Sequence, residues 1–192
     1  MVIHRRADKV LCLETGKKVE LLSAFERVLE LQEVFRDRSL LPYDKDRAAK
    51  ILLFGGARLT KPEFKEAFLL ACNVLFPQKP YDGPRAFDLQ QDAALIYAAF
   101  WQTYGIDLHR VEGLSWESFV ALLGGLPSNT RFMEVVQIRL KPLPKPTKHN
   151  QEEIRKLMEA KAKYRIRLTE EEEKNQFQAG LQRLAQSLMK GG

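Results

Sequence analysis

Apolar residues recur every three or four positions through most of this chain, and the segments that carry them stop at Gly or Pro. This spacing places apolar side chains on one face of an α-helix, whereas a half-buried strand would need every second position. Helices of this kind bury their apolar faces against one another. The pattern therefore predicts a mainly α fold.

Capping residues set the expected helix boundaries. Ser23 with Glu26 fits a capping box, in which a hydroxyl and a carboxylate accept from the unpaired amides of the first turn. Thr60 is expected to cap another helix, with Pro62 in its first turn, where the missing amide does little harm. Asp88 is expected to begin another helix, and Gly105 to end it. The predicted helices cover residues 23–37, 44–54, 60–76, 88–104, 116–124, 130–140 and 151–166, with a last one beginning at residue 169.

Residues 9–22 are expected to form a small β-hairpin, because two short apolar runs flank Thr15-Gly16-Lys17 and glycine permits a tight turn. Residues 141–150, "KPLPKPTKHN", contain three prolines and are expected to be an extended, semi-rigid linker. The predicted organisation is a small helical domain with the hairpin over residues 1–140, the linker over 141–150, and a basic helical arm over 151–192.

The segment 113–132, "GLSWESFVALLGGLPSNTRF", raises three possibilities: an active-site wall, a stacking platform for nucleic acid, or a core helix. Trp116, Phe119 and Val120, together with two leucines, cover most of the circumference of the predicted helix. A helix that is apolar nearly all round is buried. We therefore expect a core helix that ends at Gly124-Gly125.

Charge and cysteine content narrow the classes of function. The chain has 31 Lys and Arg against 25 Asp and Glu, a net charge of +6, and the excess lies mostly in residues 141–192. A nucleic-acid-binding domain concentrates such charge on its folded platform, so nucleic acid is not the expected partner. Cys12 and Cys72 are expected to be free thiols in a reducing cytoplasm. No segment has the apolar length of a signal peptide core or a membrane span, and no membrane association is expected.

Motifs for chemistry are absent from the sequence. It contains no phosphate-binding loop, dinucleotide-binding glycine motif, zinc-binding H-E-x-x-H or nucleophile elbow. His109 stands in a loop beside Asp107 and Arg110, where a structural or exposed histidine is the expected role. We expect no catalytic residue, no metal site and no cofactor.

A stripe of apolar residues follows the linker near the C-terminus. It is spaced at steps of four, three and four along an otherwise polar helix, and can bind a helical partner or dock on the chain's own domain. These candidate partner-binding residues are Phe177, Leu181, Leu184 and Leu188.

Several blocks of the sequence resemble the bacteriophage gene-product-fifteen family. They are the acidic start Asp88–Asp92, the "YGIDL" block at 104–108, the "LSWESFVALLGGL" block at 114–126, and "IR" at 138–139. The basic segment "AKYRI" at 162–166 also fits. The structural signature residues of this resemblance are Tyr104, Gly105, Trp116, Phe119 and Arg139.

The resemblance implies a role in siphophage tail morphogenesis, because such proteins resemble products encoded between the major tail protein and the tape-measure protein. It implies a non-catalytic tail assembly chaperone or scaffold in the cytoplasm of the bacterial host, with the tape-measure protein or the major tail protein as partner. The resemblance is compatible with either a monomer or a homo-oligomer. The alternative is a nucleic-acid-binding phage protein that acts through the basic C-terminal arm.

Overall fold

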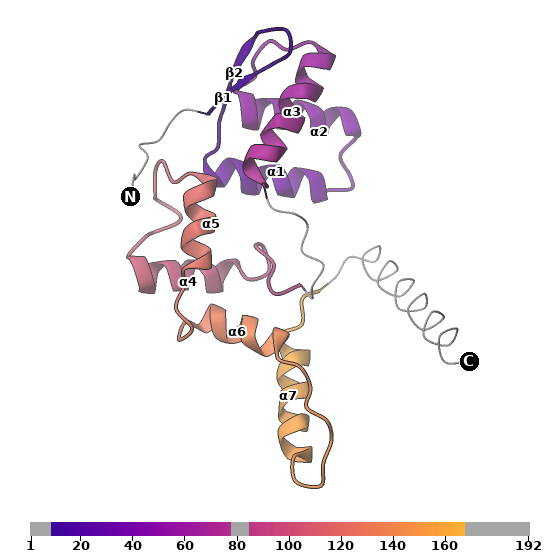
Figure 1. Ribbon diagram of the computed structural model, residues 1–192, viewed down its shortest axis with the longest axis vertical. Coiled ribbons are helices and arrows are strands. Elements are labelled where there is room, and N and C mark those ends of the chain that lie inside the picture. Colours follow the sequence, from indigo (N-terminus) through magenta and orange to yellow (C-terminus); the bar gives the residue numbers. More distant parts are fainter. Residues whose placement is uncertain (1–8, 78–84, 168–192) are drawn as a thin grey trace, which may run out of the picture. The chain divides into compact units, whose positions relative to one another are not determined.

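A computed structural model describes residues 9–77 and 85–167, and Figure 1 shows its ribbon. The described residues form seven helices and one two-stranded antiparallel sheet, which confirms the expected mainly α fold with an N-terminal hairpin. The elements in chain order are β1 (Lys9–Cys12), β2 (Lys18–Leu21), α1 (Phe25–Arg36), α2 (Pro42–Phe54), α3 (Lys61–Leu75), α4 (Ala93–Tyr104), α5 (Trp116–Gly124), α6 (Arg131–Leu140) and α7 (Gln151–Lys163).

The chain divides into two compact units. Unit 1 comprises residues 1–82 and 97–127, and unit 2 comprises 83–96 and 128–192. Residues 128–140 and 151–167 lie in the same unit, on either side of the segment 141–150 that is predicted to be a linker. The expected arm from Thr169 onward, with its helix, lies outside the described residues.

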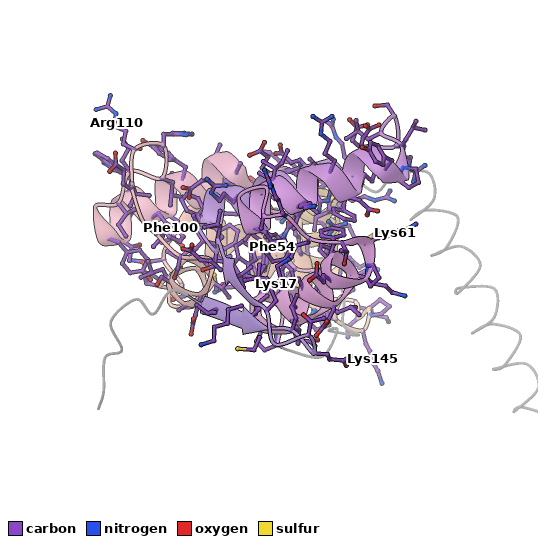
Figure 2. The ribbon with its side chains drawn as sticks, turned by 90° about the horizontal axis from the view of Figure 1, so that it is seen from above. Lys17, Phe54, Lys61, Phe100, Arg110 and Lys145 are labelled. Atoms are coloured by element: carbon purple, nitrogen blue, oxygen red, sulfur yellow. The ribbon has the colours of Figure 1, made fainter. Side chains whose placement is uncertain are left out.

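The hairpin in unit 1 pairs Lys9 with Leu21 and Cys12 with Lys18, with Gly16 at a φ of 80° in the turn. Strand β1 contacts α3 and strand β2 contacts α2, as Figure 1 shows. The buried faces of the hairpin and helices form the unit's core, which includes Leu21, Val28, Leu53 and Phe119. Phe54 and Phe100 of this core are labelled in Figure 2.

The cap predicted at Thr60 is confirmed, and in the structure it is part of a capping box with Glu63. The Thr60 hydroxyl accepts from the Glu63 amide, and the Glu63 carboxylate accepts from the Thr60 amide at 2.7 Å. Ser115 and Thr130 also cap helices, by accepting from the amides of Ser118 and Met133.

The capping box predicted at Ser23 and Glu26 is wrong. The residue before α1 is Ala24, which makes no side-chain cap, and the Phe25 amide instead donates to the Leu114 carbonyl at 3.0 Å. The Trp116 amide donates to the Ser23 carbonyl at 2.7 Å. A bridge between two distant segments therefore satisfies the polar groups that the sequence assigns to a local cap.

The helix predicted to begin at Asp88 begins five residues later, at Ala93. The Asp88 carboxylate accepts from the amides of Gln90 and Gln91, each at 2.9 Å, and holds residues 89–92 as a turn. An aspartate offers such a turn as readily as a helix cap, because both use a carboxylate that accepts nearby amides.

Two apolar patterns are less completely buried than predicted. On α5, Trp116 and Phe119 are buried, but Val120 is 44% exposed. On α7, Leu157 is buried and Met158 is 54% exposed. The helix α7 also ends at Lys163. Ile166, predicted to lie on its apolar stripe, is buried but lies in the segment after the helix.

Candidate functional site

The Arg139 side chain, in the last turn of α6, is the centre of a polar cluster in unit 2. Its guanidinium donates to both carboxylate oxygens of Asp92, at 2.6 and 2.8 Å. It also donates to the carbonyls of Ala86, at 3.2 Å, and Tyr164, at 2.6 Å. The side chains of Arg139 and Asp92 are only 10% and 4% exposed. The planar guanidinium thus joins three segments through a two-pronged ion pair and two carbonyls.

The turn before α4 positions Asp92 for this pair. The Asp92 carboxylate also accepts from the Asp88 amide at 2.9 Å. The Asp88 side chain is itself buried, and its carboxylate pairs with Arg85. Each buried carboxylate therefore has an arginine partner and amide donors, as buried charges require.

Residues 164–167, which we call the strap, follow α7 and contact this cluster. The Gln91 carboxamide donates to the Arg167 carbonyl at 2.8 Å and accepts from the Arg167 amide at 2.9 Å. Between these contacts and that of Tyr164, the Ile166 side chain is 7% exposed. The strap is thus contacted through backbone groups of Tyr164 and Arg167 and through the buried Ile166 side chain.

Basic residues of α6 and α7 form further hydrogen bonds between α6, α7 and the strap. Lys161 donates to the Arg139 carbonyl at 2.6 Å, and Arg131 donates to the Tyr164 hydroxyl. The Glu134 carboxylate, at 2.6 Å from the Arg131 guanidinium, raises the pKa of Arg131, and Tyr164 adds to the effect. Arg139, named from the family resemblance alone, therefore lies at the junction of these contacts.

The other signature residues lie in unit 1. The Phe119 ring stacks on Phe25 at 5.2 Å, on Phe100 at 5.3 Å and on Trp116 at 5.6 Å between centroids. The buried Trp116 indole donates to the Leu75 carbonyl at 3.1 Å. Both residues bury apolar area, and the indole also satisfies a carbonyl at the end of α3.

Tyr104 and Gly105 close the end of α4. The Tyr104 hydroxyl donates to the Leu122 carbonyl at 2.8 Å, which joins α4 to α5. Gly105 has a φ of 66°, and its amide donates to the Trp101 carbonyl at 3.0 Å. A left-handed glycine at this position ends the helix, as the sequence predicts.

The candidate partner-binding residues Phe177, Leu181, Leu184 and Leu188 lie outside the described residues. The structure shows exposed apolar side chains on two described helices, which sequence reasoning missed. Trp101 on α4 is 54% exposed and Val120 on α5 is 44% exposed. The signal in the sequence is that α4 contains no charged residue and α5 contains only Glu117.

The loop after α4 places the His109 ring 4.7 Å from the Tyr97 ring, and the Tyr97 ring stacks on Trp101. The His109 amide donates to the Asp107 carboxylate at 3.0 Å. Arg110 projects from the ribbon in Figure 2, with 87% of its side chain exposed. Over residues 9–77 and 85–167 no group of three His, Cys, Asp or Glu side chains is arranged to hold a metal ion.

Among the helices of residues 9–77 and 85–167, none has the length and apolar character that crossing a membrane requires.

Comparison with known proteins gives one match. The family model described as Bacteriophage Gp15 protein matches residues 57–166, more than half of the chain. Comparisons with the curated proteins and with the solved structures found no match. The matched range contains the Arg139 cluster, the strap up to Ile166, and the Trp116 core. The chain therefore belongs to the Bacteriophage Gp15 protein family, a family of phage structural and morphogenesis proteins.

Proposed function

We propose that this protein is a non-catalytic tail assembly chaperone or scaffold, which binds the tape-measure protein or the major tail protein in the cytoplasm of the bacterial host. Membership of the Gp15 family supports a role in phage morphogenesis. The choice of a chaperone rests on the genomic position that the resemblance implies, and on a surface suited to binding protein.

The observation that carries this proposal is the exposure of apolar side chains on the nearly uncharged helices α4 and α5. Trp101 and Val120 are about half exposed on two helices that carry a single charged residue between them. Charged residues make up 29% of the whole chain, whereas these two helices, of 12 and 9 residues, carry one. Protein interfaces have cores depleted in charge and enriched in tryptophan, and exposed apolar patches often mark them.

The proposed partner is an amphipathic helix of the tail protein. Such a helix lays its apolar face on an apolar surface, and a large tryptophan provides an anchor of the kind that dominates binding energy. A helical tail protein that is made before its partners are assembled exposes apolar surface, and a chaperone covers it until assembly.

Co-expression with the cognate tape-measure and major tail proteins, followed by affinity purification, tests this proposal. Trp101→Glu is expected to abolish co-purification, because it places a charge in the interface. Leu41→Glu, at a residue that is 66% exposed elsewhere on the chain, is the matched control and is expected to retain binding. If neither tail protein co-purifies with the wild type, the proposal fails. If Trp101→Glu binds normally, α4 is not the binding surface.

A truncation after Arg167 tests the contribution of Phe177, Leu181, Leu184 and Leu188. This end point keeps the strap and its contacts with Gln91, whereas a truncation after Leu140 would remove the Tyr164 carbonyl that Arg139 binds. Loss of co-purification in the truncated chain would assign the binding to the terminal stripe. Unchanged co-purification would assign it to the described surface.

Nucleic-acid binding through the basic arm is the alternative function, and the described part of the arm does not favour it. Arg155 pairs with Glu152 and Glu159, and Lys156 pairs with Glu152. Paired cations release fewer counterions on binding phosphate. Gel shifts at low salt with DNA and RNA test this alternative, and steeply salt-dependent binding would support it.

A further inference from the structure

The contacts between the strap and Gln91 have the form of a strand pairing made by a side chain. The Gln91 carboxamide gives one hydrogen bond to the Arg167 carbonyl and takes one from the Arg167 amide. Two such bonds are what the peptide group of a neighbouring antiparallel strand would make. Three residues earlier in the strap, the Tyr164 carbonyl accepts a hydrogen bond from the Arg139 guanidinium at 2.6 Å.

The strap is recognised through backbone groups and through the side chains of Tyr164 and Ile166. The contacts from Gln91 and from Arg139 are made to backbone groups, which every peptide segment presents. The anchor is the buried Ile166 side chain, while the Arg165 and Arg167 residues are exposed. The chemical class that fits is therefore a short peptide with an aliphatic residue at the position of Ile166 and an aromatic hydroxyl at that of Tyr164.

The Arg139 guanidinium is positioned by bonds in which the strap takes no part. Asp92 fixes it through two hydrogen bonds, and the Asp88 amide in turn donates to Asp92. Asp88 also accepts from the backbone amide of Gln91 at 2.9 Å, whereas the exposed Gln91 carboxamide bonds to the strap itself. Release of the strap therefore leaves Arg139 pre-organised and the Gln91 backbone in place.

We propose that Gln91 and Arg139 form a binding site for a short peptide, which the chain fills with its own residues 164–167 and which also accepts the same segment of a second copy. A second copy presents a segment of identical chemistry by construction. Exchange of an identical element between protomers is a low-cost route to association, because the same contacts are made again. This exchange is separate from tail-protein binding through Trp101, so either one can fail while the other holds.

The experiment uses the full chain with its own strap disabled. Ile166→Asp places a charge at the buried anchor, and Arg167→Pro removes the amide that donates to Gln91. The probe is a fluorescent peptide of residues 160–167, and its binding is measured by anisotropy. A scrambled peptide of the same composition controls for attraction between charges.

Saturable binding of the peptide to either disabled variant is expected, with at least about tenfold weaker binding to the wild type because its site is filled. Adding Gln91→Ala to either variant is expected to weaken binding by about tenfold, since two hydrogen bonds are lost. Gln102→Ala is the matched control; its carboxamide is exposed and has no hydrogen-bond partner among the described residues.

Two results would overturn the proposal. One is the absence of saturable binding to both disabled variants while circular dichroism shows that their helices are retained. The other is equal binding to the disabled variants with and without Gln91→Ala, or equal binding of the scrambled peptide. The two variants disrupt different contacts of the strap, one the buried Ile166 side chain and the other the Arg167 amide. If one variant misfolds, the other still tests the proposal.

Discussion

Arg139 and Asp92 form a two-pronged ion pair at 2.6 and 2.8 Å, with both side chains at least nine-tenths buried, across 47 residues of sequence. The pair joins the end of α6 to the turn before α4. It also sets the position of Ala86 and Tyr164, whose carbonyls accept from the same guanidinium.

Arg139→Met is expected to destabilise the protein by about 3–5 kcal/mol, because it leaves the buried Asp92 carboxylate without its cation. The double variant with Asp92→Leu is expected to recover part of this loss, since neither charge is then buried alone. Urea unfolding followed by far-ultraviolet circular dichroism measures both.

Arg155→Met is the matched control for this prediction. Arg155 is 62% exposed, and its pairs with Glu152 and Glu159 should contribute at most about 1 kcal/mol. If the Arg139 and Arg155 substitutions lower the free energy of unfolding equally, the prediction that Arg139 contributes more to stability is wrong.

Gly125 and Gly124 are expected to respond in opposite directions to substitution by alanine. A Cβ at Gly125 would lie 3.1 Å from the Tyr104 hydroxyl and 3.4 Å from the Ala121 carbonyl, whereas a Cβ at Gly124 meets nothing within 4 Å. Tyr104 cannot move freely because it donates to Leu122. We expect Gly125→Ala to cost about 1–2 kcal/mol and Gly124→Ala to stabilise α5 by about 0.5–1 kcal/mol. Thermal melts of the two variants measure the difference.

Trp116→Ala is expected to cost about 3–5 kcal/mol, because it removes a buried aromatic ring that stacks on Phe119. Trp116→Phe keeps a ring but leaves the Leu75 carbonyl without its donor, at a cost of about 1–3 kcal/mol. Chemical denaturation distinguishes the two. A Trp116→Ala variant that keeps wild-type stability but loses a partner would make this residue part of a binding site.

The capping box of α3 predicts a pH dependence. The Thr60 amide and hydroxyl, and to a smaller degree Lys17, lower the pKa of Glu63. The unfolded chain then binds a proton more readily than the folded chain. The resulting stability is present above the ordinary Glu pKa, about 4.3, and is lost as the pH falls through the lower value of the folded state.

Glu63→Gln is therefore expected to flatten the decrease in stability between neutral and acidic pH, as measured by urea unfolding at several pH values. Glu26→Gln is the matched control, because Glu26 occupies the corresponding position of the predicted capping box that does not form. A wild-type acid dependence in Glu63→Gln would show that the cap does not depend on this charge.

The sequence by itself determined the helices, the hairpin and several caps, because these depend on residues that are neighbours in the chain. The cap at Thr60 and the helix end at Gly105 follow from local hydrogen bonding and from the φ that glycine permits. The core position of Trp116 and Phe119 follows from helical periodicity.

Only the tertiary structure decided which segments share polar groups. Leu114 supplies the carbonyl that makes a cap at Ser23 unnecessary, and Arg139 reaches Asp92 across 47 residues. Local propensity allows Asp88 to begin either a helix or a turn. In the structure it begins a turn, in which Asp92 accepts from the Asp88 amide and pairs with the distant Arg139. Such long-range pairs leave no repeating pattern in the sequence. They can therefore be identified only from the folded structure, in which the segments lie side by side.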